Sequence, residues 1–127
     1  MKTCSRSFGL LLCTGLLTVP LRALDWERSL IETKPEAGAE VVRVQFPYRN
    51  SSGQTVHILG VTTSCGCTEA TIDSSEVAPQ STGVLHVLFT IGQRSGRQEK
   101  IITVTSDDAK QPQQLVLKVA LPEKPRQ

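Results

Sequence analysis

A chain of 127 residues has room for one domain of ordinary size. Its 14 basic and 12 acidic residues nearly balance and are interspersed along the chain, which gives no electrostatic case for binding to nucleic acid or to an acidic membrane surface.

The first 23 residues have the layout of a secretory signal peptide. Lys2 and Arg6 supply a basic start, residues 8–19 form an apolar run, and the small residue Ala23 stands at the predicted cut. The run is shorter than the roughly 20 apolar residues of a membrane-spanning helix. We therefore expect cleavage after Ala23, export to the periplasm or the extracellular space, and no membrane insertion once the leader is removed.

Removal of the leader changes both the charge and the cysteine count. Three basic residues leave with it, so residues 24–127 carry 11 basic against 12 acidic side chains. Cys4 and Cys13 leave as well, and Cys65 and Cys67 are the two cysteines that remain. Export would place this pair in a compartment where disulfides persist.

Beyond the leader, apolar and polar residues alternate with a period of two, which predicts β-strands with one buried face. The clearest case lies in residues 40–48, where Val42, Val44, Phe46 and Tyr48 share a face. An early strand holds Trp26, whose indole we expect to pack on the sheet rather than to stack on carbohydrate. Further strands are predicted over residues 55–64, 84–91, 98–105 and 114–121.

The pattern in residues 55–64 differs from the others, because apolar side chains fall on both faces. Val56 and Ile58 share one face, whereas Leu59, Val61 and Thr63 share the other. This predicts a strand that is buried on both sides.

Six or seven short strands, separated by turn signals about every ten residues, predict an all-β fold. We expect an antiparallel immunoglobulin-like β-sandwich of about seven strands over residues 24–121, followed by a disordered tail over residues 122–127. The Cys…Trp…Cys spacing of antibody domains is absent from the sequence. Burial of the strands must therefore stabilise the fold in place of an inter-sheet disulfide.

Four short patterns in the mature chain form a recognisable set: Phe46-Pro47-Tyr48-Arg49-Asn50, Ser64-Cys65-Gly66-Cys67-Thr68, a Gly-led strand over residues 83–89, and Ile102-Thr103-Val104-Thr105-Ser106. With them the chain resembles a bacterial exported family known as a domain of unknown function, DUF1573. Gln80 stands where that family usually has glycine, and Asp107 where asparagine is common. The resemblance implies an immunoglobulin-like fold similar to the major-sperm-protein and Hydin domains, which generally bind or scaffold proteins.

The Cys65/Cys67 pair is the main candidate for chemistry. Residues two apart in a strand point to one face, so the two thiols are neighbours. Their Cα atoms would lie near the upper limit of about 6.8 Å for a disulfide, and the chain would have to pinch at Gly66. A bridge that closes so short a loop adds little chain-entropy stabilisation. Redox use therefore explains the pair better than a structural staple does.

Three other interpretations of the pair stay open. Two thiolates suit copper(I) or zinc, but a closed zinc site takes about four ligands, and the available histidines are poor supplements. His57 stands eight residues before Cys65 on the same predicted strand, and we expect His86 to face solvent. The cysteines are otherwise a free dithiol, a mixed disulfide with another protein, or small partly buried hydrophobic residues.

The sequence holds no Gly-x-Ser-x-Gly elbow, phosphate-binding loop or His-Glu-x-x-His motif. We therefore expect no catalytic residue, no cofactor, and a non-enzymatic protein-binding or structural module whose partners are other envelope proteins. The alternative is a thiol-redox or copper(I)-binding protein that uses Cys65 and Cys67.

Overall fold

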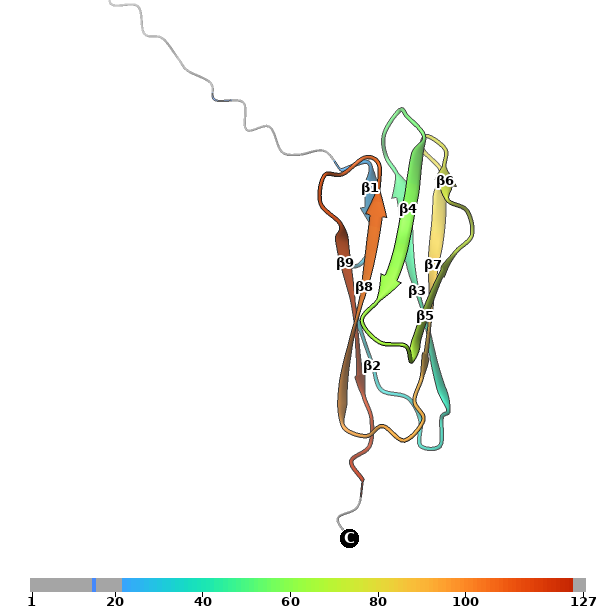
Figure 1. The fold of residues 1–127 in the computed structure, drawn as a ribbon, viewed down its shortest axis with the longest axis vertical. Coiled ribbons are helices and arrows are strands. Elements are labelled where there is room, and N and C mark those ends of the chain that lie inside the picture. Colours follow the sequence, from blue (N-terminus) through green and yellow to red (C-terminus); the bar gives the residue numbers. More distant parts are fainter. Residues whose placement is uncertain (1–14, 16–21, 125–127) are drawn as a thin grey trace, which may run out of the picture.

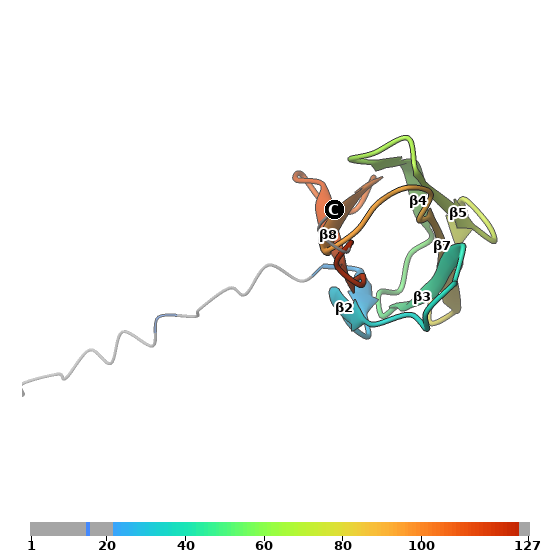
Figure 2. The same cartoon turned by 90° about the horizontal axis from the view of Figure 1, so that it is seen from below.

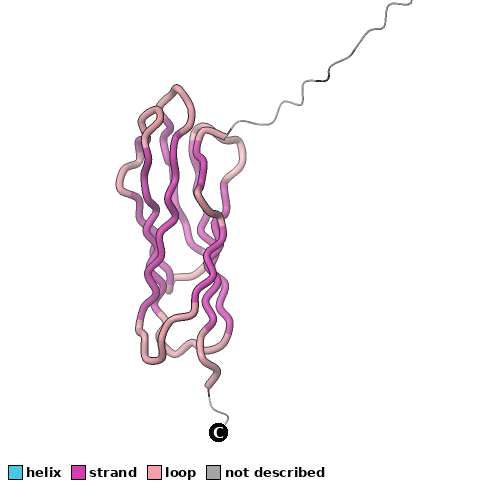
Figure 3. Tube along the Cα trace, turned by 180° about the vertical axis from the view of Figure 1, so that it is seen from behind, coloured by secondary structure: helices cyan, strands magenta, loops and turns pink. Residues whose placement is uncertain are grey.

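The computed structural model describes residues 15 and 22–124, and residues 22–124 form a two-layered β-sandwich (Figures 1 and 2). Most of the predicted signal peptide and residues 125–127 of the predicted tail lie outside the described residues. In the part of the chain that the structure describes, no helix is long and apolar enough to cross a membrane. Figure 3 shows that the sandwich is built from strands and the loops that join them.

The described residues contain nine strands: β1 (Leu24–Trp26), β2 (Leu30–Thr33), β3 (Val41–Asn50), β4 (Val56–Thr63), β5 (Thr68–Ile72), β6 (Glu76–Val77), β7 (Thr82–Thr90), β8 (Arg97–Ser106) and β9 (Gln113–Ala120). One sheet has the order β1-β3-β7-β5 and the other the order β2-β9-β8-β4-β6. The predicted all-β immunoglobulin-like sandwich is confirmed. One pair departs from the antiparallel expectation, because β2 runs parallel to β9.

The core lies between the two sheets and follows the predicted alternation. Val42, Phe46 and Tyr48 of β3 are buried, as are Leu115 and Leu117 of β9. The outward side chains of these strands include Arg43 and Gln45 of β3 and Lys118 of β9, so the outer faces of the sheets are more polar than the inner ones. Trp26 packs on Tyr48 with ring centroids 5.0 Å apart, and its indole N–H donates to Gln113.

Strand β4 corrects the expectation of burial on both sides. The ladder between β4 and β8 shifts register between Ile58 and Gly60, which marks a β-bulge at Leu59. The bulge reverses the alternation, so that Val61 lies opposite the buried Val104 while Leu59 is 67% exposed. Val56, Ile58 and Val61 therefore face the same core while Leu59 faces solvent, and the prediction of a strand buried on both sides was wrong.

A buried asparagine holds one end of the sandwich together. The Asn50 side chain is fully buried, and its amide donates to the carbonyls of Gln54 at 2.7 Å, Val77 at 2.9 Å and Ala78 at 3.3 Å. Its carbonyl oxygen accepts the Ser52 N–H at 3.0 Å. Because one side chain satisfies several backbone groups, it fixes the turn after β3 and the loop before β7 relative to each other.

Candidate functional site

The Cys65/Cys67 pair lies in the turn that carries the chain from β4 in one sheet to β5 in the other. The sequence suggested that these residues continue a strand, but β4 ends at Thr63 and β5 begins at Thr68. The change of sheet requires a sharp turn here, and it brings the Cα atoms of the two cysteines to 5.2 Å. That spacing lies within the range of disulfides.

Hydrogen bonds on both sides hold this turn. The Thr68 N–H donates to the Cys65 carbonyl at 3.1 Å, and the Thr63 hydroxyl donates to the carbonyls of Cys65 at 3.0 Å and Thr68 at 2.9 Å. Ser64 is bound to β8 through its N–H, which reaches the Ile101 carbonyl at 2.9 Å. The turn is therefore attached to the ends of strands in both sheets.

In the structure a disulfide joins Cys65 to Cys67. Gly66 between them has no heavy atom within 4 Å of the position that a Cβ would take, and its φ lies outside the left-handed region. The pinch at this position therefore needs no left-handed backbone angle, and the space beside the Gly66 Cα is open.

Two cationic side chains lie close to this turn. The Arg94 guanidinium, from the loop between β7 and β8, reaches the Cys65 Sγ at 4.0 Å. Lys100 of β8 is buried, and its Nζ lies 5.2 Å from the centre of the Phe89 ring. Phe89 belongs to β7, the strand next to β5. Burial, and then the charge of Arg94, lower the pKa of Lys100. Arg94 therefore places a cationic group beside Cys65.

The two histidines lie away from the cysteines, as the sequence indicated. His57 is at the β6 end of β4, where its Nδ1 lies 2.7 Å from Asp107 Oδ2 and its Nε2 lies 3.6 Å from Glu76. His86 projects from the outer face of β7, 3.1 Å from Asp73. In the ranges that the structure covers, no three His, Cys, Asp or Glu side chains gather as candidate metal ligands.

The sequence reasoning missed the role of Arg94 and of the Asp107-Asp108 pair. Arg94 is 29 positions from Cys65, and no spacing rule connects the two. Asp108 accepts the Ala23 N–H at 3.0 Å and so holds the start of β1. Paired acidic residues in a loop between strands were the signal that could have indicated such contacts.

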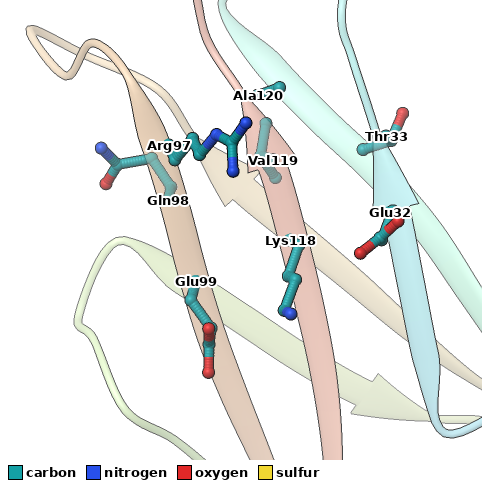
Figure 4. Close-up of a pocket in the computed structure, with 8 residues that line it drawn as sticks. All are labelled: Glu32, Thr33, Arg97, Gln98, Glu99, Lys118, Val119 and Ala120. Carbon is teal, nitrogen blue, oxygen red and sulfur yellow. The ribbon is translucent and has the colours of Figure 1, made fainter.

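A second feature is a shallow groove of about 480 Å³ on the outer face of β2, β9 and β8 (Figure 4). Lys118 of β9 lies between Glu99 of β8 and Glu32 of β2 in the ladder register. The next row of the same face is apolar and consists of Leu30, Val116 and Ile101 in register. Leu30 at the end of this row is 45% exposed, so the row is partly open to solvent at the edge strand.

Solved structures show that this arrangement of strands is a PapD-like, immunoglobulin-like sandwich. The ASH/PapD-like domain 7 of human CEP192 is similar over 96% of this chain and 100% of its own, with a TM-score of 0.67 and 11% identity. A protein of unknown function from Porphyromonas gingivalis W83 gives a TM-score of 0.69 at 15% identity, over 78% of this chain and 46% of that one. The Pseudomonas aeruginosa CupB2 chaperone gives 0.60 at 12% identity, over 76% and 55%.

The family is shown by the sequence itself. The chain belongs to the family described as protein of unknown function (DUF1573), whose model matches residues 24–121. No curated protein matches the sequence. The chain spans less than half the length of the Porphyromonas gingivalis protein, so the likeness to that structure concerns one domain of it.

Proposed function

We propose that this protein is an exported, non-enzymatic module of the bacterial envelope that binds an extended segment of another protein along β2. Export is supported by the basic start and the short apolar run of the first 23 residues. The family match begins at residue 24, directly after the predicted cut. Domains with this fold include a bacterial protein described as a chaperone, the CupB2 protein, which favours protein binding.

The observation that carries the proposal is the free edge of β2. Among the strands of residues 22–124, this one is the last in its sheet and has β9 as its one neighbour. The Val116 N–H donates to the Ser29 carbonyl, so in a parallel ladder Ser29, Ile31 and Thr33 direct their backbone groups to β9. The backbone groups of Leu30 and Glu32 therefore point away from the sheet, where an added strand would bind them.

The side chains beside this edge indicate the chemistry of the partner. An added strand would place alternate side chains next to the outer face, beside Leu30 and beside Glu32. The apolar row that begins at Leu30 suits an aliphatic or aromatic side chain, and the Glu32 carboxylate suits a basic one two residues away. We therefore expect an extended partner segment with an apolar and a basic residue at this spacing.

The test is site-specific photo-crosslinking of the full chain in living cells. A photoreactive amino acid in place of Leu30 should give a discrete crosslinked protein, whereas the same residue in place of Arg43, on the outer face of the other sheet, should not. In a second background, Glu32→Pro removes an outward N–H and should abolish the crosslink, while Glu32→Ala keeps that N–H and should preserve it. Equal crosslinking at both positions, or none at Leu30, would reject strand addition at β2.

A second candidate function, thiol–disulfide exchange, is favoured by the Cys65–Cys67 disulfide, whose two cysteines are only half-buried. Copper(I) binding would use the same two sulfurs in their reduced form. Mass spectrometry of the exported protein, alkylated with and without prior reduction, distinguishes these states. A pair that is always reduced, metal-free and unreactive would remove both redox exchange and copper binding.

A further inference from the structure

The two sulfurs of the disulfide have different surroundings. Both cysteines are half-buried, but of the two it is Cys67 that packs against the hydrophobic core. The Cys67 carbonyl also accepts the Thr90 N–H at 2.9 Å, which attaches this residue to β7. Cys65 precedes Gly66 in the turn and lies on the side of the Arg94 loop. An incoming reagent therefore meets Cys65 with less displacement of the core.

The hydrogen-bond donors are also distributed unequally. Cys65 Sγ accepts the backbone N–H of Cys67 at 3.2 Å and lies 4.0 Å from the Arg94 guanidinium. Cys67 Sγ has the hydroxyl of Thr68 at 3.6 Å. A cation and a backbone N–H favour a thiolate more than a hydroxyl does, because both present fixed positive charge to the sulfur.

We propose that Cys65 is the sulfur that exchanges with partner thiols, and that Cys67 is the resolving sulfur that closes the bond again. This inference rests on the second candidate function, thiol–disulfide exchange, and goes beyond it by giving each cysteine a separate role. Arg94 is the side chain that stabilises Cys65 in its anionic form and attracts an anionic thiolate to it.

The reaction partner in this thiol–disulfide exchange is a dithiol, which supplies the two electrons that reduce the Cys65–Cys67 bond. A partner thiolate attacks Cys65 Sγ, the bond between Cys65 and Cys67 breaks, and its electron pair stays on Cys67 Sγ, which takes a proton from water. A second partner thiolate then attacks the partner sulfur bound to Cys65 and releases Cys65 as a thiolate. The partner dithiol is oxidised to a disulfide, and the protein is reduced to a Cys67 thiol and a Cys65 thiolate, which takes a proton from water in turn.

Arg94 is held in position for this role by the loop that carries it. Its guanidinium donates to the carbonyls of Ile91 at 3.3 Å and Thr90 at 3.4 Å, so it spans the gap between this loop and the cysteine turn. The loop itself needs glycine at two positions, since Gly92 and Gly96 have φ values of 56° and 71°. The charge therefore stays near Cys65 rather than moving freely in solvent.

The first experiment maps the mixed disulfide on the oxidised wild-type protein, incubated with reduced glutathione and quenched by acid and alkylation. Peptide mass spectrometry should find glutathione on Cys65. Glutathione on Cys67 would overturn the assignment of roles while leaving exchange itself intact. Absence of any adduct on the folded protein would reject thiol exchange, and with it this inference, while leaving the proposal for β2 untouched.

The second experiment compares the single thiols of Cys67→Ser and Cys65→Ser, whose folding is checked by thermal melting. Each reacts with an aromatic disulfide such as dithionitrobenzoate at a series of pH values. The Cys65 thiol should react faster at neutral pH by about two- to threefold, because one unit charge at 4 Å in water raises the thiolate fraction about fivefold while the lower pKa makes the thiolate less nucleophilic. Equal rates, or a faster Cys67 thiol, would contradict the proposal.

The role of Arg94 is tested in the Cys67→Ser background. Arg94→Gln should slow the Cys65 reaction at neutral pH by about two- to threefold and move the pH of half-maximal rate upward. Arg94→Lys, which keeps the charge, should restore most of the rate. If Arg94→Gln leaves both the rate and the pH profile unchanged, Arg94 has no electrostatic role at this sulfur.

Discussion

The ring of Tyr48 lies directly over Gly83, its partner across the ladder between β3 and β7. A Cβ at position 83 would come within 2.5 Å of the Tyr48 Cζ. The glycine therefore makes room for the ring, and the ring in turn supports Trp26 at the start of the fold. The Gly-led strand and the aromatic residue before Asn50 are two parts of one packing unit.

Gly83→Ala should destabilise the protein by about 1–3 kcal/mol, because the buried ring has to move from a well-packed position. Chemical denaturation followed by tryptophan fluorescence measures both the stability and the displaced ring. Gly60→Ala is the matched control, since this strand glycine has open space around its Cβ position. Equal losses in the two variants would show that the Tyr48 contact has no effect on stability.

Asn50→Ala should cost about 3 kcal/mol, because it leaves buried backbone carbonyls without donors at the end of the sandwich. Asn50→Asp should cost at least as much at neutral pH, since a carboxylate turns an acceptor toward the carbonyls of Val77 and Ala78. Urea denaturation of both variants checks this. Gln54→Ala keeps the backbone carbonyl that Asn50 binds and should change little. If Asn50→Ala leaves the free energy of unfolding unchanged, the loops are fixed by other contacts.

Ile58→Ala and Leu59→Ala test the bulge in β4. Ile58 is 6% exposed and Leu59 is 67% exposed, although they are adjacent and similar in size. Truncation at Ile58 should cost about 2–5 kcal/mol, whereas truncation at Leu59 should stay within about 0.5 kcal/mol of the wild type. Thermal or urea denaturation gives both values. A larger loss at Leu59 would mean that the strand has the opposite phase.

Gln80 adopts a φ of 62°, a left-handed conformation that glycine tolerates best. Its side chain amide donates to the carbonyls of Ser51 at 3.0 Å and Ser52 at 3.2 Å. Gln80→Ala and Gln80→Gly both lose these bonds, but only glycine relieves the strain of the left-handed conformation. Gln80→Ala should therefore be less stable than Gln80→Gly by about 1 kcal/mol. Urea denaturation of this pair is the measurement. Equal stability would show that position 80 carries no strain.

Asp107 should give the fold an acid-sensitive component of stability. Hydrogen bonds from the His57 backbone N–H, and then from its side chain, hold the pKa of Asp107 below its ordinary value of 3.8. The unfolded chain therefore binds the proton more tightly, so this stabilisation is full above the unfolded pKa and is lost as the pH falls through the folded one. The stability difference between wild type and Asp107→Asn should be constant at neutral pH and shrink below pH 3.8.

His57→Ala provides the control for that measurement. The backbone N–H of His57 survives the substitution and still donates to Asp107 at 2.8 Å in the native arrangement. In the His57→Ala background, part of the acid-sensitive stabilisation by Asp107 should therefore remain. Denaturation curves at several pH values check both variants. A difference between wild type and Asp107→Asn that stays unchanged down to the most acidic pH would contradict the role given to Asp107.

The strands that the sequence predicted well are those whose alternation is uninterrupted. In β3 and β9 the side chains at every second position are apolar, and burial of that face against the other sheet is a local consequence of strand geometry. The same applies to the family patterns, whose residues are contiguous. The short β2 was missed, because four residues without strong alternation gave no signal apart from their pairing with β9.

The cysteine turn separates what the sequence determined about this protein from what only the tertiary structure determined. From the sequence alone came the all-β class, the inward faces of the long strands, and Cys65 and Cys67 as the candidate pair, because these depend on residue type and on periods of a few positions. Tertiary structure alone decided that the pair lies in a turn between sheets, that Arg94 lies beside one sulfur, and that the bulge at Leu59 reverses the faces of β4. These features depend on which distant segments of the chain pair with each other, and a pattern of a few neighbouring residues does not predict that pairing.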